Sequence, residues 1–230
     1  MKLKVLGSGS SGNCYLLEYD NQTLILDCGI HIKEIKKGLN WDLSKVVGVI
    51  ATHEHSDHIK SLKDIRNIGI DTFTPFESKN LWQKATFGNF HIQSFDVPHN
   101  DTKNVGFLIT VADQKILYLT DLEYCPYSFA KTKVNHILIE CNYADEYLDK
   151  DIPNYEHKIR GHCSLDTCKG FIKTNNSDAL RSVILLHLGE GIKDTSQIVA
   201  EVKKIVNFDV FVDYAKAGKE FELRETESPF

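Results

Sequence analysis

Three histidines and one aspartate lie within six residues of one short segment, which reads THEHSDH over residues 52–58 and directly follows the apolar run VVGVI. In extended backbone, alternate side chains point to the same side, so His53 and His55 can converge on one metal ion. If the chain then turns into a helix, Asp57 and His58 can reach a second ion nearby. The spacing predicts ligands for two metal ions, although a polar loop rich in histidine is the alternative.

Two ions need more ligands than these four side chains, so histidines and carboxylates at the ends of predicted strands are the next candidates. Three such residues close apolar or alternating runs: His99, Asp121 and His187. A residue at a strand end is often only a turn residue, but together the three strengthen the prediction of a metal site. Nitrogen and carboxylate donors suit zinc and also accommodate manganese, so we expect two divalent ions, Zn²⁺ or Mn²⁺.

Strands and helices alternate in both halves of the chain, which is typical of an α/β protein. Apolar and β-branched runs predict strands at Leu3–Leu6, Cys14–Tyr19, Thr23–Leu26, Lys45–Ala51, Asp71–Phe73, Phe90–Val97, Val105–Val111, Ile116–Thr120, His136–Ile139, Ser182–Leu186 and Phe208–Val212. Helical spacing predicts helices at Ile30–Leu39, His58–Asn67, Leu165–Lys173 and Thr195–Val206. Acidic residues and histidines therefore stand where apolar strands stop.

The composition is that of an ordinary soluble globular protein, with 230 residues, 42% hydrophobic and 26% charged, and we expect a single domain over residues 1–230. No apolar run approaches the roughly 20 residues that cross a bilayer, and the first residues do not resemble a signal peptide, so we expect a cytoplasmic protein without membrane contact. The six cysteines lack CxxC spacing, which favours buried free thiols over a zinc ribbon or disulfide scaffold. A net charge of −5 does not indicate which class of substrate the protein binds, and the sequence does not predict the oligomeric state.

The order of the candidate residues along the chain resembles the motif series of the metallo-β-lactamase superfamily. The series is Asp27, His53, His55, Asp57, His58, His99, Asp121 and His187, and it covers most of the chain. The resemblance implies an α/β (α+β) fold, the four-layer αββα metallo-β-lactamase sandwich. The predicted order of strands and helices is compatible with that fold.

The resemblance also implies a role for each residue. His53, His55 and His99 would hold the first metal ion, and Asp121 would bridge both ions. Asp27 matches an aspartate that orients the metal loop, which here is residues 52–58, through hydrogen bonds without binding metal itself. A plain turn aspartate is the alternative for that position.

The second ion would be held by Asp57, His58 and His187.

A narrower resemblance is carried by the strings GSGSSGNC near the N-terminus, GHCS at residues 161–164 and LHLG at residues 186–189. These strings are similar to those of small bacterial proteins of the YycJ type, which are related to ribonuclease Z and are phosphodiesterases or nucleases. The glycine and serine loop can offer backbone N–H groups to a phosphate, and a flexible turn is the alternative.

Glu140 and His162 match the glutamate and histidine with which enzymes similar to ribonuclease Z pass a proton toward the leaving oxygen. Together with Asp57 as a proton acceptor, they are the expected catalytic residues. The alternative is that Glu140 ends a strand in solvent and His162 caps the helix that starts near Leu165. The resemblance implies a dinuclear metal-dependent hydrolase, a phosphodiesterase or nuclease resembling DNA or RNA exonucleases, in which a metal-bridging hydroxide attacks phosphorus.

Other functions of the same fold compete with this interpretation. A glyoxalase II-like thioester or lactone hydrolase shares the HxHxDH series, but the pair Glu140 and His162 counts against it. Diiron flavoproteins share the fold but typically carry glutamate where this chain has His55, which disfavours that function. A scaffold protein without activity would lack some of the metal ligands, whereas the series here is complete. The chain also lacks the long arm with which ribonuclease Z grips transfer RNA. We expect a phosphodiester substrate, with single-stranded nucleic acid as one candidate.

Overall fold

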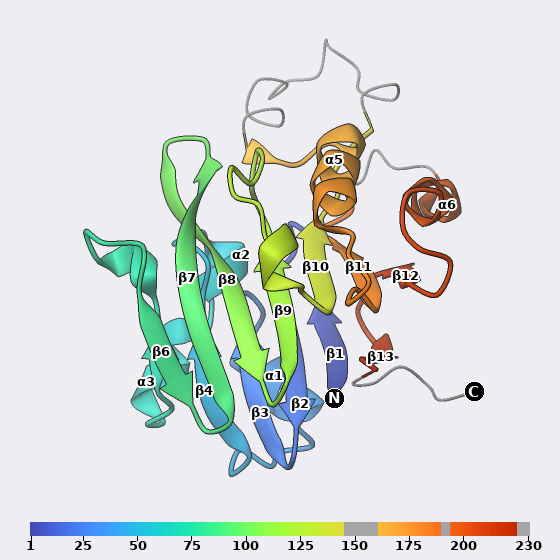
Figure 1. The fold of residues 1–230 in the computed structure, drawn as a ribbon. Coiled ribbons are helices and arrows are strands. Elements are labelled where there is room, and N and C mark those ends of the chain that lie inside the picture. Colours follow the sequence, from blue (N-terminus) through green and yellow to red (C-terminus); the bar gives the residue numbers. More distant parts are fainter. Residues whose placement is uncertain (145–160, 190–193, 225–230) are drawn as a thin grey trace.

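Two β-sheets lie face to face in the computed structural model, which describes residues 1–144, 161–189 and 194–224 (Figure 1). In pairing order, the first sheet contains β13 (Glu220–Glu222), β1 (Lys2–Gly7), β2 (Cys14–Tyr19), β3 (Gln22–Leu26), β4 (Val46–Ile50) and β5 (Thr72–Phe73). The second contains β12 (Phe211–Tyr214), β11 (Ser182–Leu186), β10 (His136–Glu140), β9 (Gln114–Leu119), β8 (Thr102–Val111), β7 (Phe90–His99) and β6 (Lys84–Phe87).

Helices cover the outer face of each sheet. The described helices are α1 (Ile32–Gly38), α2 (Ser56–Ile59), α3 (Leu62–Asn67), α5 (Leu165–Asn175) and α6 (Thr195–Lys203), with short 3₁₀ turns at Pro75–Glu77 and Ala130–Thr132. Ile35 of α1 and Ile65 of α3 pack on the first sheet, and Ile172 of α5 and Val202 of α6 pack on the second. The expected four-layer αββα architecture is confirmed.

The core between the sheets follows from the alternation of side chains along each strand. In β2, Tyr15 and Leu17 belong to the inter-sheet core, whereas Leu16 belongs to the layer under the helices. Across this core the rings of Tyr15 from the first sheet and Tyr118 from the second pack edge to face, with centroids 5.8 Å apart. Both sheets share this core, which supports the expectation of one domain over residues 1–230, although that expectation stays a prediction.

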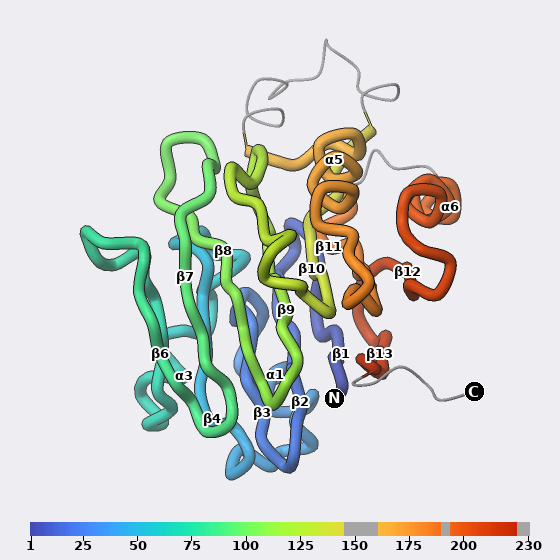
Figure 2. Tube along the Cα trace, viewed as in Figure 1, coloured from blue at the N-terminus to red at the C-terminus, as the bar shows by residue number. Residues whose placement is uncertain are grey.

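Several chain segments run parallel and therefore end at the same edge of the sandwich. β3 pairs with β4 in parallel, and β9, β10, β11 and β12 form a parallel set. The tube in Figure 2 follows these segments to the common edge. Residues that directly follow the strands are gathered there, as in open α/β sheets generally.

The predicted helix His58–Asn67 is wrong in two respects. The helix begins earlier, at Ser56, and it is interrupted before α3 begins. Ser61, at the interruption, donates its backbone N–H to the carbonyl of Cys28 and its hydroxyl to the carbonyl of Ile30. These long-range hydrogen bonds replace those that a continuous helix would make.

The strands that were misplaced or missed lie at the sheet edges. The strand predicted at Phe208–Val212 instead spans Phe211–Tyr214, because Phe208 lies fully exposed in the preceding turn. The strands β6 and β13 were not predicted, since both are short and pair on one side only. All six cysteines are free and all except Cys125 are buried, as expected. None of the helices in the described residues is long and apolar enough to cross a membrane.

His136 in β10 gives a prediction for stability. Burial lowers its pKa from 6.5 to about 3, and its ring contacts the Ser182 hydroxyl at 2.8 Å and the Gln114 side-chain oxygen at 3.3 Å. Below pH 6.5 His136 becomes protonated in the unfolded chain but stays neutral in the folded protein. Falling pH therefore destabilises the fold until about pH 3. Between about pH 8 and pH 5 the loss is about 2 kcal/mol.

A His136→Gln variant, although less stable near neutral pH, is therefore expected to lose about 2 kcal/mol less than the wild type over that interval. Urea unfolding at a series of pH values measures the two slopes. Equal slopes for the two proteins would contradict this account.

Candidate metal centre

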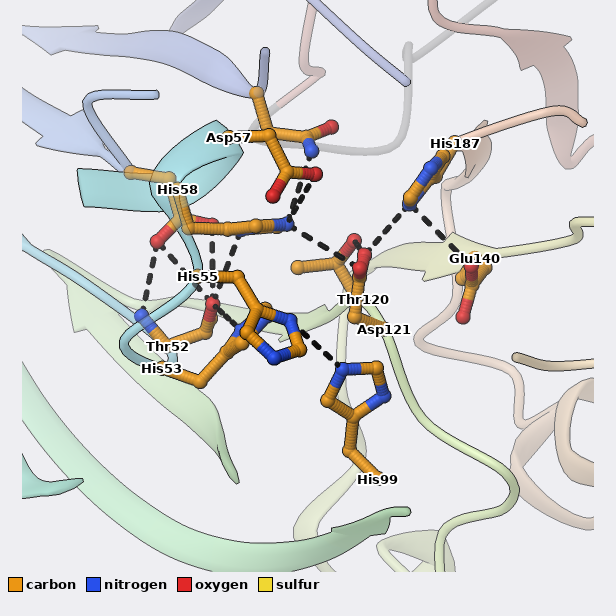
Figure 3. Close-up of polar contacts among 12 residues, drawn as sticks. Thr52, His53, His55, Asp57, His58, His99, Thr120, Asp121, Glu140 and His187 are labelled. Carbon is orange, nitrogen blue, oxygen red and sulfur yellow. Dashed lines mark hydrogen bonds and ion pairs between the residues drawn. The ribbon is translucent and has the colours of Figure 1, made fainter. Parts of the chain in front are cut away.

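The predicted site residues lie together at the edge where the parallel strands end, and Figure 3 labels all of them except Asp27 and His162. Asp27 follows β3, Asp121 follows β9 and His187 follows β11. All three have left-handed backbones, with φ of 53°, 49° and 46°. Such a conformation costs a non-glycine residue on the order of 1 kcal/mol and persists where the surroundings enforce it. Here it aims each side chain into the shared edge.

Three imidazoles converge at one side of this edge. The Nδ1 atom of His55 lies 3.0 Å from Nε2 of His53 and 3.3 Å from Nε2 of His99. His99 contacts the carbonyl of Gly161 through Nδ1 at 2.7 Å, and a proton on that nitrogen leaves a lone pair on Nε2. Burial lowers the pKa of His99 to about 4 and that of His53 well below its usual range. Neutral imidazoles with facing lone pairs suit a divalent cation.

His58 faces three carboxylates on the other side. Its Nδ1 atom contacts Oδ2 of Asp27 at 2.7 Å, and its Nε2 atom lies 3.3 Å from Asp121 and 3.6 Å from Asp57. Burial opposes a charge on this ring, but Asp121 and Asp27 raise its pKa well above the usual range. Without a metal ion, these carboxylates favour a proton on the His58 ring. A bound cation would supply the positive charge in place of that proton.

His187 completes this side of the edge. Its Nδ1 atom lies 2.6 Å from Asp121 and 3.4 Å from Glu140, while its buried Nε2 atom has no hydrogen-bond partner within the described residues. Against the effect of burial, Asp121 raises the pKa of His187 to about 9. A buried nitrogen without a partner, beside two carboxylates, is chemically suited to metal binding.

Ligand atoms within 4.8 Å of one another form three groups in the described residues, all of predicted site residues. They are His53, His55 and His99; His53, His58 and Asp121; and Asp121, Glu140, His162 and His187. Asp121 and His53 each occur in two groups, and of the two Asp121 has a carboxylate, whose two oxygens could contact two ions. The residues fit divalent metal binding, whereas the role of each one stays a prediction.

Glu140 is fully buried and its carboxylate is engaged on both oxygens. Oε2 accepts the backbone N–H groups of Leu122 at 3.0 Å and Cys163 at 3.2 Å, and Oε1 lies 2.7 Å from Nδ1 of His162. The hydrogen bond to Glu140 raises the pKa of His162 despite burial. The structure does not support the alternative in which Glu140 faces solvent and His162 caps α5, because the cap is Ser164.

Asp27 is the fully buried anchor of the metal loop. Its Oδ1 atom accepts the Thr52 N–H at 2.9 Å, and its Oδ2 atom accepts the Tyr118 hydroxyl at 2.5 Å in addition to the contact with His58. Each of these contacts would hold the loop in place without a bond from Asp27 to metal. This geometry is the one expected of an orienting aspartate.

Sequence reasoning missed three residues that support the site. Thr52 and Tyr118 bind Asp27, and Asn13 is a buried residue whose Nδ2 atom lies 3.0 Å from Nε2 of His58. Asn13 ends the glycine and serine loop that precedes β2, and this was its only signal. Tyr118 gave no signal, because an apolar strand carries tyrosine for packing as readily as for hydrogen bonding.

Comparison with known proteins supports the predicted family. Residues 7–72 match the metallo-β-lactamase superfamily. The protein named exodeoxyribonuclease WalJ from Streptococcus pneumoniae (serotype 2, strain D39) is 27% identical over 98% of this chain and 94% of its own length. The protein named exodeoxyribonuclease YycJ from Bacillus anthracis is 24% identical over 99% of this chain and 96% of its own length.

A solved structure shows that the fold is shared. The metallo-β-lactamase fold protein YhfI from Bacillus subtilis superposes with a TM-score of 0.73 at 20% identity, covering 96% of this chain and 98% of its own. Together with the layers and strand order described above, this likeness confirms the metallo-β-lactamase sandwich predicted from the sequence.

The contacts of Asp27 predict that an Asp27→Asn variant binds metal less tightly. With its oxygen toward the Thr52 N–H, an amide would present N–H groups to the Tyr118 and His58 donors, so His58 would lose its orientation. Loss of such a partner typically lowers metal affinity by roughly 10- to 100-fold. Equilibrium dialysis followed by elemental analysis measures the effect.

The matched control is Asp20→Asn, since Asp20 is also left-handed, with φ of 47°, but exposed in the turn between β2 and β3. Its metal content should equal that of the wild type. Equal metal affinity in Asp27→Asn and Asp20→Asn would contradict the orienting role.

Proposed function

We propose that this chain, which carries the metallo-β-lactamase fold, is a metal-dependent nuclease that removes nucleotides from DNA strands with two bound divalent ions. The observation that carries the proposal is the pair of Glu140 and His162 beside the predicted metal ligands. Relatives that span nearly the whole chain bear the name exodeoxyribonuclease, which supports the same substrate class. Two ions would supply positive charge for the phosphate oxygens and activate water near neutral pH.

The ions would be zinc or manganese. His53, His55 and His99 offer three nitrogens to one ion, which favours a borderline metal such as zinc. The neighbouring position adds carboxylate oxygens of Asp57 and Asp121, which manganese also accepts. The ligand set therefore supports both metals.

Asp57 and His162 have complementary tasks in this proposal. The Asp57 side chain is 24% exposed and lies at the rim of the cluster, where its carboxylate can accept a proton from the attacking water. His162 is held through Nδ1 by Glu140 and is 17% exposed, so the ring is oriented and within reach of the substrate. We assign to His162 the delivery of a proton to the leaving sugar oxygen.

The leaving group separates this function from a thioester hydrolase. A deoxyribose alkoxide is a poor leaving group and gains much from a proton donor, whereas a thiolate leaves readily without one. A buried glutamate that orients a histidine toward the substrate is therefore of most use in phosphodiester chemistry.

The same argument predicts how a His162→Ala variant behaves with two substrates. Cleavage of single-stranded DNA should fall by roughly 10²- to 10⁴-fold, the typical contribution of general acid catalysis. Hydrolysis of bis-p-nitrophenyl phosphate should fall far less, because nitrophenolate needs no proton to leave. Asp121→Ala should lose both activities, since Asp121 contacts both His58 and His187.

Steady-state rates of zinc- or manganese-loaded protein measure these effects. His91→Ala, which changes an exposed histidine on β7, is the control. Equal losses on both substrates in His162→Ala would remove the proton-donor role. A loaded protein that cleaves a thioester or lactone but no phosphodiester would overturn the proposed function.

A further inference from the structure

A cavity of about 400 Å³ lies beside the candidate metal centre. One wall is the glycine and serine loop between β1 and β2. The other is the segment 214–217, which begins at the last residue of β12. Leu188 and Gly189, which directly follow His187, lie between the two walls. The volume falls within the range of small-ligand pockets, roughly 300–1,000 Å³.

Ser8 joins this cavity to the metal centre. Its hydroxyl oxygen accepts the hydroxyl of Tyr15 at 2.8 Å and the backbone N–H of His187 at 3.0 Å. The Tyr15 hydroxyl also lies 3.4 Å from Oδ1 of Asn13, so the Ser8 hydroxyl can donate either to Tyr15 or to a ligand in the cavity that it lines. The cavity thus contains a hydroxyl group with which a ligand can form a hydrogen bond.

The loop is held rigidly enough to form a binding wall. Gly9 donates its N–H to Oδ1 of Asn13 at 2.9 Å, and Gly12 donates to the carbonyl of Gly9 at 2.9 Å. Gly9 and Gly12 have φ of 137° and 142°, which only glycine adopts readily. Ser11 lies between them, lines the cavity, and its backbone N–H donates to no other group in the described residues. The alternative of a flexible turn is not supported.

The charge of the cavity suits an anion. Lys216 lines the opposite wall, is exposed, and forms no ion pair within the described residues. The described lining contains no acidic side chain. By contrast, a larger cavity of about 640 Å³ at the other end of the sandwich is lined by side chains of both charges, with Glu18, Asp20, Asp42 and Glu222 beside Lys2 and Lys45.

From these contacts we propose that the cavity binds one nucleoside monophosphate unit, the terminal nucleotide of the strand being cleaved. Its phosphate would accept from Ser8, Ser11 and Lys216, and its sugar and base would lie on Leu188 and Tyr214. The assignment to a strand end rests on the proposed function. It would make this cavity the part of the enzyme that distinguishes an end from the interior of a strand.

Two variants test the cavity in the full-length, metal-loaded protein. Lys216→Ala removes the cation, and Ala217→Trp fills the space from an exposed position of the lining. Lys84→Ala, on the exposed edge strand β6, is the matched control. Calorimetric titration with thymidine monophosphate should show binding that weakens roughly tenfold or more in both variants, the size expected for a charge-assisted hydrogen bond, and is unchanged in the control.

Kinetics with linear and circular single strands of one sequence test whether the cavity binds a strand end, because only the linear strand has one. For Lys216→Ala, the ratio of kcat/KM on the linear strand to that on bis-p-nitrophenyl phosphate should fall roughly tenfold, mainly through KM. The linear strand should carry a terminal phosphate at the 5′ end in one series and at the 3′ end in another, which identifies the end that is bound.

Weaker nucleotide binding with an unchanged kinetic ratio would mean that a free nucleotide occupies the cavity, and the strand-end assignment would be overturned. Unchanged binding in both variants would overturn the site itself. If the wild type cleaves no phosphodiester, the proposed function fails, yet the titration with thymidine monophosphate still decides whether the cavity binds a nucleotide.

Discussion

The buried carboxylate of Asp27 links the two sheets to the metal loop. It accepts hydrogen bonds from Thr52 at the end of β4 and from Tyr118 in the opposite sheet, and it contacts His58 in α2. A fully buried carboxylate is tolerated only when its lone pairs are satisfied, so these partners must stay in place for the fold to keep its charge buried. The position of the metal loop thus depends on the packing of one sheet against the other.

The electrostatics of the centre divide it into two halves. Burial keeps His53 and His99 neutral, with lowered pKa values, whereas neighbouring carboxylates raise the pKa values of His58 and His187. Asp121 lies between the halves and faces both raised histidines. Two cations would satisfy the neutral nitrogens on one side and replace protons on the other. Protons and metal ions therefore compete for the same buried negative charge.

The sequence predicts the parts of this site that depend on local spacing. The HxHxDH segment follows a strand and enters a helix, so its four candidate ligands are recognisable from seven residues. His99, Asp121 and His187 could be found because each closes an apolar strand, and parallel strands bring their ends together. Asn13 and Tyr118 could not, because their contacts with His58 and Asp27 join residues 45 and 91 positions apart. The interruption of the helix before α3 could not be predicted for the same reason, because Ser61 forms hydrogen bonds with the carbonyls of residues distant in sequence.

Anomalous scattering from crystals of the metal-loaded protein, recorded at the zinc and manganese absorption edges, tests the central claim most directly. The account predicts two peaks, one enclosed by His53, His55 and His99 and one beside Asp121, His58 and His187. A single peak, or a peak away from these residues in fully loaded crystals, would contradict the two-metal centre on which the proposed function depends.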